Sequence, residues 1–370
     1  MVSCSSRPSI TTMSSSERPV RRVLIADDSD LMRSMLREQI THGGAFEIAG
    51  EAATGYEVIR MVHELDPDII TLDLAMPDLG GVEALDYVLS QAPRPVVIIS
   101  AHDRSLVDPA LNAMVAGAVE FVAKPSGSTI DEARAFRTRL YQAMRAASVA
   151  HLLNLPRRIQ QSQSRARRPH DSAPAARCAV AIAASTGGPR ALTEIVPRLP
   201  EELPAAVFIV QHMPPLFTSA FARRLDQMSA LPVREAEQGE MVEEGVVYIA
   251  RGGAHLDLQR ADGVMRIVLS DAIPVWNVRP AADVLFRAVA RTFGPASVGV
   301  VLTGMGRDGA EGLRAIAEVG GSTLAQDAES SVIASMPRAA APHAQRIVPL
   351  TALGGEIGRQ AVLRARARAG

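Results

Sequence analysis

The sequence predicts an α/β protein made of two units joined by a linker. From Arg21 onward, short apolar runs alternate with polar turn residues and amphipathic stretches, which is typical of strands alternating with helices. The pattern stops at residues 151–176, which are rich in Pro, Gln, Ser and Arg, and resumes after Arg177. A segment of that composition cannot bury a core. We therefore expect one domain over 21–150, a linker over 151–176 and a second domain over 177–370.

Composition limits the possible classes of protein. With 370 residues and 47% hydrophobic content, the chain can bury two or three cores, and its net charge of −1 gives no reason to expect nucleic acid as a partner. Cys4 and Cys178 are too few for a disulfide framework, which fits a reducing cytoplasm. No apolar run approaches the roughly 18 residues of a membrane span. We expect a cytoplasmic monomer without membrane insertion, preceded by a disordered Ser/Thr-rich tail over 1–20 that lacks the apolar core of a secretory signal.

The first domain contains five strand–helix repeats, which predict a doubly wound parallel sheet. Polar side chains follow its strands, namely Asp27, Asp28, Asp73, Ser100 and Lys124. Because the carboxyl ends of parallel strands meet at one edge of a sheet, we expect these side chains to converge. Three carboxylates at one edge favour Mg²⁺, and Lys124 supplies a positive charge for a phosphoryl group accepted by Asp73. Turn formation and capping would explain one acidic corner, but not all of these residues together.

The segments ADDS, TLDLAMPDLGGVEAL, VIISAH and AKP resemble the receiver domain of bacterial response regulators. This resemblance implies a flavodoxin-like fold with a five-stranded parallel sheet. It also implies that Asp73 is the phosphoacceptor, that Asp27 and Asp28 bind Mg²⁺ together with Asp73, and that Ser100 and Lys124 are the switch hydroxyl and the phosphate contact. The phosphodonor would be a sensor histidine kinase.

The second domain begins with an apolar run over 179–184, followed by Ser185 and by a turn whose Pro189 opens a helix. Ser185 alone could be a helix N-cap. However, two further apolar runs end just before His212 and before a Gly-rich turn that carries Asp308. Serine, histidine and aspartate at one sheet edge make a nucleophile, its general base and the group that orients the base. His255 is the rival base, but it lies outside the presumed parallel sheet.

Residues 233–271 contain short strands separated by Glu-Gly, Arg-Gly-Gly and Ala-Asp-Gly, which predict an antiparallel β insertion in this doubly wound α/β domain. Helix and strand then resume. A short helix near 337–343 is expected to be the last element.

The segments IAASTGGP, IVQHMPP, VVLTGMGRDGAEGL and SMPRAA resemble the catalytic domain of the chemotaxis protein-glutamate methylesterases. The resemblance implies hydrolysis of glutamyl methyl esters on cytoplasmic helices of chemoreceptors, the methyl-accepting chemotaxis proteins, with release of methanol and with deamidation of receptor glutamines. Ser185, His212 and Asp308 would be catalytic, and Thr186 and Met305 would flank the active centre. Backbone N–H groups of residues 185–186 and of the turn 304–306 could hold the oxyanion, and no metal is needed in the esterase site.

Two other classes of function remain open from the sequence. One is an interaction protein that is controlled by phosphorylation and whose hydrolase-like domain is inactive. The other is an amidase that acts mainly on glutamine. For the esterase, the arrangement of domains suggests control of access: a receiver packed over the edge with Ser185 would block a bulky helical substrate, and phosphorylation of Asp73 would favour an open state.

Overall fold

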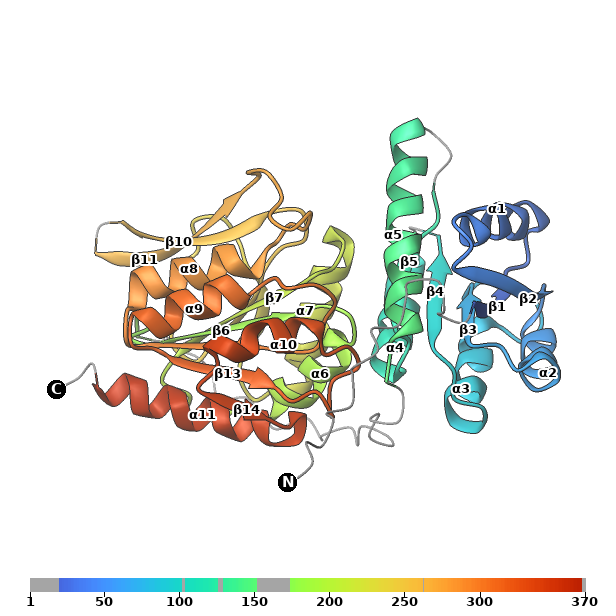
Figure 1. The fold of residues 1–370 in the computed structure, drawn as a ribbon. Helices are drawn as coiled ribbons and strands as arrows, with labels where there is room; N and C mark the ends of the chain where they lie inside the picture. Colours follow the sequence, from blue (N-terminus) through green and yellow to red (C-terminus); the bar gives the residue numbers. More distant parts are fainter. Residues whose placement is uncertain (1–19, 102–103, 126–128, 152–173, 262, 368–370) are drawn as a thin grey trace, which may run out of the picture.

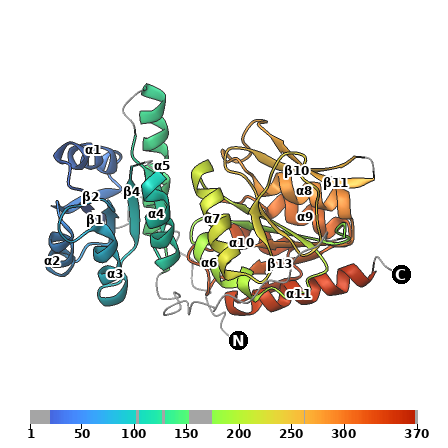
Figure 2. The ribbon, with the colours of Figure 1, turned by 180° about the vertical axis from the view of Figure 1, so that it is seen from behind.

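The computed structural model of the chain describes residues 20–101, 104–125, 129–151, 174–261 and 263–367. Nearly all of the tail expected over 1–20, and most of the linker expected over 151–176, lie outside these residues. The described chain forms two α/β lobes that lie side by side, the first over 20–151 and the second over 174–367 (Figures 1 and 2). None of the helices among the described residues is long and apolar enough to cross a bilayer.

The first lobe is a five-stranded parallel sheet in the order β2-β1-β3-β4-β5, as predicted. Its central strands are buried on both faces because helices cover both sides. Ser29, Thr54 and Thr129 cap the helices that follow them. The strands are β1 (Arg21–Ala26), β2 (Phe46–Ala52), β3 (Ile69–Leu72), β4 (Val96–Ser100) and β5 (Glu120–Ala123), and the helices are α1 (Asp30–Thr41), α2 (Gly55–Leu65), α3 (Gly81–Gln91), α4 (Arg104–Ala116) and α5 (Ile130–Ser148).

The second lobe has a seven-stranded parallel sheet in the order β14-β13-β12-β6-β7-β9-β8 and a separate antiparallel pair, β10-β11. Helices again cover both faces of the large sheet (Figure 1). The strands are β6 (Ala179–Ala184), β7 (Ala206–Gln211), β8 (Val233–Glu235), β9 (Val247–Ile249), β10 (His255–Ala261), β11 (Val264–Ser270), β12 (Ser297–Val301), β13 (Ser322–Gln326) and β14 (Arg346–Val348). The α-helices are α6 (Gly188–Ile195), α7 (Pro215–Met228), α8 (Ala282–Phe293), α9 (Ala310–Glu318), α10 (Ser335–Ala340) and α11 (Leu350–Ala367).

Two expectations about this lobe need correction. The antiparallel insertion is smaller than predicted, because β8 and β9 extend the large parallel sheet and only β10 and β11 pair antiparallel. All three residues of β9 are buried, as in an internal strand. In addition, the chain does not end its regular structure near 337–343, since β14 and the long helix α11 follow. Gly354 and Gly358 let α11 approach Arg198 and Pro200 closely, and these glycines obscure the helical pattern in the sequence.

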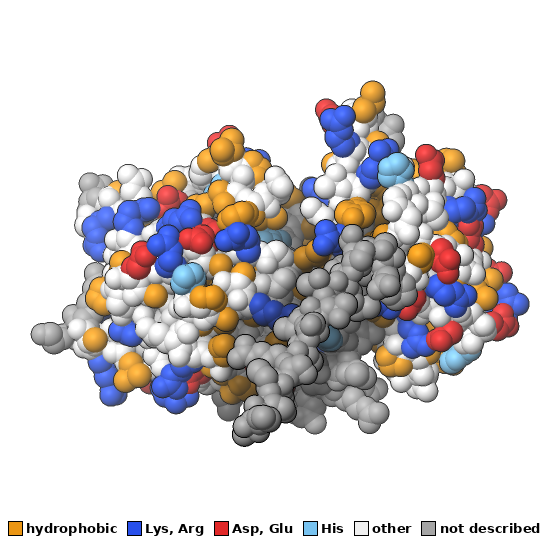
Figure 3. Space-filling model, viewed as in Figure 1, with side chains coloured by type: hydrophobic (Ala, Val, Ile, Leu, Met, Phe, Trp, Pro, Cys, Tyr) orange, Lys and Arg blue, Asp and Glu red, His pale blue; other side chains and the backbone are white. Residues whose placement is uncertain are grey.

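The two lobes meet where α4 of the first lies against α6 and α7 of the second, as both ribbon views show. The aromatic rings of Phe121 and Phe217 pack with their centroids 4.6 Å apart, and Arg190 Nη1 donates to the Ala116 carbonyl at 3.4 Å. Beyond α5, the His151 N–H donates to the Val332 carbonyl at 3.0 Å. On the face drawn in Figure 3, basic and acidic side chains are interspersed over both lobes.

Candidate active site

The polar side chains predicted for the first sheet edge meet there. Asp73, almost fully buried after β3, accepts a hydrogen bond from Ser100 Oγ at 3.0 Å and contacts Lys124 Nζ at 2.6 Å. Lys124 Nζ also lies 2.7 Å from an Asp27 carboxylate oxygen. Each of Asp27, Asp28 and Asp73 offers an oxygen within 4.8 Å of the others, a donor set that suits Mg²⁺.

Burial and charge oppose each other at this edge. Burial raises the pKa of Asp27, and the hydrogen bond from Lys124 only partly offsets that effect. Burial alone would lower the pKa of Lys124, but its hydrogen bonds to Asp27 and Asp73 outweigh burial and raise that pKa. The lysine is therefore held charged between two carboxylates, where a further anionic oxygen on Asp73 would find a cation ready.

In the second lobe, Ser185 stands directly beyond β6, between the ends of two neighbouring strands. Its N–H donates to the Thr303 carbonyl at 3.1 Å on the β12 side, and its carbonyl accepts from Gln211 Nε2 at 3.0 Å on the β7 side. A Cβ at Gly304 would lie 2.7 Å from the Ser185 Cβ, so the backbone passes Ser185 more closely than any side chain would allow. Ser185 begins the turn into α6, whose N-cap is Gly187 in the left-handed conformation, so it is not the helix N-cap.

His212 and Asp308 lie at the same edge and contact each other. The His212 N–H donates to the carbonyl of Ala184, the residue before Ser185, at 3.2 Å, which puts His212 beside the serine corner. On the imidazole, Nε2 lies 2.8 Å from Asp308 Oδ2. Asp308 is buried after β12, 96 residues away in sequence. The structure thus brings Ser185, His212 and Asp308 to one rim of the large sheet.

Backbone N–H groups complete this rim. The Ser185 N–H is taken by the Thr303 carbonyl. Among the described residues, none accepts a hydrogen bond from the N–H of Thr186 or of Met305. The partly buried Met305 packs its side chain against an apolar cluster that includes Ile333 and residues of α5. Thr186 and Met305 therefore offer the donors at this rim that an oxyanion would need.

His255 is engaged elsewhere. Its Nδ1 accepts from the Ala281 N–H at 3.2 Å, and its Nε2 lies 3.1 Å from the Ile273 carbonyl. Both ring nitrogens are thus used to hold the loop before α8, and the side chain is buried. His255, the alternative to His212 as general base, therefore holds this loop and does not lie beside Ser185.

Sequence reasoning missed Glu120, which the first lobe directs at this rim. The Thr186 hydroxyl donates to Glu120 Oε2 at 2.6 Å, although the two residues lie on different lobes. Burial raises the pKa of the Glu120 carboxyl, while the hydrogen bond from Thr186, the N–H of Phe121 and the charge of His212 lower it in part. Glu120 opens a strand, and nothing in its local sequence marks it as a contact residue.

Asp283 was also missed. It is fully buried in the first turn of α8, and its carboxylate accepts from the N–H groups of Gly309 and Gly312 and from the indole N–H of Trp276. A signal did exist in the sequence. Ala281 and Gly309 precede α8 and α9, and neither can cap a helix with its side chain, so the caps must come from elsewhere.

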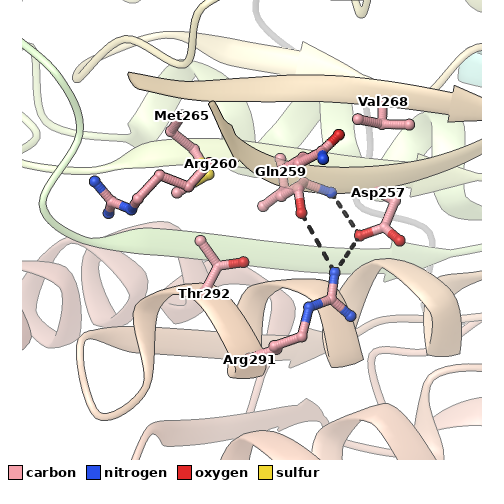
Figure 4. A pocket seen from close by; sticks show the side chains of 8 residues that line it. Asp257, Gln259, Arg260, Met265, Val268, Arg291 and Thr292 are labelled. Carbon is pink, nitrogen blue, oxygen red and sulfur yellow. Dashed lines mark hydrogen bonds and ion pairs between the residues drawn. The ribbon is translucent and has the colours of Figure 1, made fainter. Parts of the chain in front are cut away.

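A polar hollow lies away from this rim, between β10, β11 and the end of α8. Arg291 reaches across it to Asp257 Oδ1 at 2.6 Å and to the Leu258 carbonyl at 3.3 Å (Figure 4). None of the side chains predicted for the site lines this hollow.

Comparison with known proteins assigns both lobes. Residues 23–133 match the model of the response regulator receiver domain, and residues 180–357 match that of the CheB methylesterase. A Pyrococcus horikoshii protein named protein-glutamate methylesterase/protein-glutamine glutaminase is 43% identical over 321 residues, which are 86% of this chain and 87% of that protein. The chain belongs to the CheB methylesterase family. This CheB-family chain is therefore a carboxylic ester hydrolase that also carries a response regulator receiver domain, as the resemblance implied.

Other relatives of this CheB-family chain cover it almost completely. A Symbiobacterium thermophilum protein of the same name is 41% identical over 358 residues, 93% of this chain and 97% of that protein. Among solved structures, the Thermotoga maritima CheB methylesterase catalytic domain is 40% identical and covers 49% of this chain and 97% of its own, with a TM-score of 0.48.

Proposed function

We propose that the chain hydrolyses glutamyl methyl esters on the cytoplasmic helices of chemoreceptors and releases methanol. The observation that carries this proposal is the contact of His212 Nε2 with Asp308 at 2.8 Å, at the strand end beside Ser185. The names of the relatives support the substrate class. We assign the receiver domain to residues 21–150 and the methylesterase domain to 177–370, and expect the chain to act as a cytoplasmic monomer.

In the first half of the reaction, Ser185 Oγ attacks the ester carbonyl carbon while His212 takes the hydroxyl proton. Since Nε2 of His212 faces Asp308, its Nδ1 is the nitrogen left for Ser185. Asp308 stabilises the imidazolium that forms. The carbonyl oxygen becomes an oxyanion, for which the N–H groups of Thr186 and Met305 are the available donors. When the carbon–methoxy bond breaks, His212 returns the proton to the methoxy oxygen and methanol leaves.

In the second half, water attacks the acyl group on Ser185. His212 takes a proton from the water and passes it to Ser185 Oγ as the acyl bond breaks, which restores the serine and leaves a glutamate on the receptor. The same groups would serve a glutamine side chain, with ammonia as the leaving group. Deamidation of receptor glutamines is therefore part of the proposal.

We further propose that a sensor histidine kinase phosphorylates Asp73. Asp27, Asp28 and Asp73 are the residues that would hold Mg²⁺, which would neutralise charge during phosphoryl transfer. Ser100 and Lys124, which contact the two carboxylate oxygens of Asp73, would then contact the phosphoryl oxygens.

Phosphorylation would control access to the esterase site. The contacts of α4 and β5 with the second lobe support a closed state, in which Glu120 is bonded to Thr186 next to the nucleophile. A receptor helix could not reach Ser185 past this contact. A shift of Lys124 toward a phosphoryl group would move the carboxyl end of β5 and favour opening.

The test is an assay of methanol and ammonia release from methylated and amidated receptor, with full-length chain, with and without phosphodonor. We expect methanol from the wild type, more methanol with phosphodonor, and none from Ser185→Ala. Full methanol release by Ser185→Ala would refute the esterase mechanism. Release of ammonia without methanol by the wild type would show that the chain is an amidase and not an esterase.

A further inference from the structure

We propose that Asp283 is a positioning residue for the esterase: it holds the 304–309 loop so that Asp308 meets His212. The inference rests on the proposed function and deepens it. Asp283 contacts neither Ser185 nor His212 in any interaction of the described residues, so its influence would pass through Asp308.

Asp308 caps α8, the helix that carries Asp283, and Asp283 caps α9, the helix that follows Asp308. Asp308 accepts from the N–H groups of Ala282 at 2.7 Å and of Asp283 at 3.0 Å, the first two residues of α8. In return, Asp283 Oδ1 accepts from the Gly309 N–H at 3.1 Å and the Gly312 N–H at 2.7 Å, at the start of α9. Each carboxylate thus satisfies donors that its partner's helix leaves open. A displacement of one must displace the other.

The reciprocal caps set the position of the oxygen that contacts His212. Asp308 Oδ2 lies 2.8 Å from His212 Nε2 and 2.7 Å from the Ala282 N–H, so a single oxygen orients the base and caps α8. Asp308 belongs to the loop between β12 and α9, and Asp283 holds the α9 end of that loop. The same loop carries Met305, whose N–H is a proposed oxyanion donor. Asp283 therefore positions two parts of the catalytic apparatus at once.

Trp276 fixes Asp283 from the solvent side. Its indole Nε1 donates to Asp283 Oδ2 at 2.8 Å, and its backbone adopts the left-handed conformation, with φ of 55°. The guanidinium of Arg307 lies 4.9 Å from the centroid of the indole ring, and Arg307 immediately precedes Asp308. Trp276 thus contacts both Asp283, through its indole N–H, and Arg307 of the 304–309 loop, through its ring. Both oxygens of Asp283 accept N–H groups, Oδ1 from Gly309 and Gly312 and Oδ2 from Trp276, so an NH₂ group in place of either oxygen would face a donor.

The test compares full-length Asp283→Asn with wild type in the methanol assay, with kcat and KM measured separately. An asparagine keeps the shape but turns an NH₂ group toward either the Trp276 indole or the glycine N–H groups. One donor then faces another donor. We expect kcat to fall by about 10²-fold, because a small misplacement of a catalytic group is enough for such a loss, with KM within about twofold of wild type.

Two further variants sharpen the result. Trp276→Phe removes the competing indole donor, so Asp283→Asn/Trp276→Phe should recover at least about tenfold of the lost kcat, a non-additive effect expected of groups in contact. Asp283→Glu keeps the charge but displaces it, and its kcat should lie between those of wild type and Asp283→Asn. It also keeps the test open if Asp283→Asn does not fold.

Asp257→Asn is the matched control. It removes a carboxylate that contacts Arg291 (Figure 4). Arg291 lies on α8, eight residues or about 12 Å beyond Asp283. Its kcat should match that of wild type. Equal kcat for Asp283→Asn and wild type, an equal loss in Asp257→Asn, or no recovery in the double variant would overturn the role of Asp283. A wild type that releases no methanol would instead refute the proposed function.

Discussion

Replacement of Glu120 by alanine tests the closed state most directly. The carboxylate of Glu120 accepts from the Thr186 hydroxyl at 2.6 Å across the lobe interface, beside the proposed nucleophile Ser185. Removing it should favour the open state and raise methanol release from the unphosphorylated chain. The contacts of Phe121 with Phe217 and of Arg190 with Ala116 remain, so the lobes should still associate in part.

The size of the effect follows from that one contact. A hydrogen bond to a neutral group contributes about 0.5–1.5 kcal/mol net, which corresponds to about 2- to 12-fold in the ratio of closed to open chains. Burial raises the pKa of Glu120 despite its hydrogen bonds, so the closed state favours the neutral carboxyl and the gain applies below that raised pKa. We therefore expect Glu120→Ala to raise the basal rate by up to about tenfold at a pH below the raised pKa, with a matching decrease in the stimulation by phosphodonor.

The assay is methanol release from methylated receptor by full-length chain, with and without a small-molecule phosphodonor and Mg²⁺. Glu64→Ala is the control, since Glu64 is an exposed glutamate on α2 whose ion-pair partner is Arg60 on the same helix. It should leave both rates unchanged. A basal rate of Glu120→Ala equal to that of wild type, with normal stimulation, would show that the contact with Thr186 does not hold the chain closed.

Three further results are expected. Burial raises the pKa of Glu120 in the closed state above its value in the open state, so closure is strongest at low pH and weakens as the pH rises through the raised pKa. Basal methanol release by the wild type should therefore increase over that pH range. Glu120→Ala should lack this increase. Asp73→Asn, or removal of Mg²⁺ by a chelator, should abolish the stimulation of methanol release by phosphodonor. Chelation should leave the basal release intact, because the proposed esterase steps use only side chains and backbone groups. Loss of the basal rate on chelation would contradict this. Gly304→Ala would place a Cβ 2.7 Å from that of Ser185 and 2.2 Å from Met336 Sδ, so kcat should fall by about 10²-fold, and an unchanged kcat would show that Ser185 tolerates displacement.

The predictions that succeeded rest on signals that are local in sequence. Asp73, Ser185 and His212 each stand directly after an apolar run, and the parallel connection of strands brings such positions to one edge. Position along the chain was therefore enough to anticipate that Asp73 lies at the edge of the first sheet, and Ser185 and His212 at the edge of the second. The five-stranded sheet of the first lobe followed from the same rule.

The features that the sequence did not reveal depend on contacts between distant segments. Glu120 and Thr186 are 66 residues apart, and they meet only because the lobes dock. Asp283 looks like an ordinary acidic residue in a first helical turn, until α9 is placed against it. The parallel pairing of β9 also depends on burial between two other strands, which its three residues cannot specify alone.

Strand β5 has a consequence for engineering hybrid regulators. Its amino end carries Glu120, which faces the hydrolase. Lys124 follows its carboxyl end and contacts Asp73, the proposed phosphoacceptor, a separation of about 13 Å along an extended chain. A transplanted receiver that has the lysine but not the glutamate would keep the contact with Asp73 and lose the contact with Thr186. We expect such a chimera to accept phosphate normally and to show a raised basal rate of ester hydrolysis, as Glu120→Ala should.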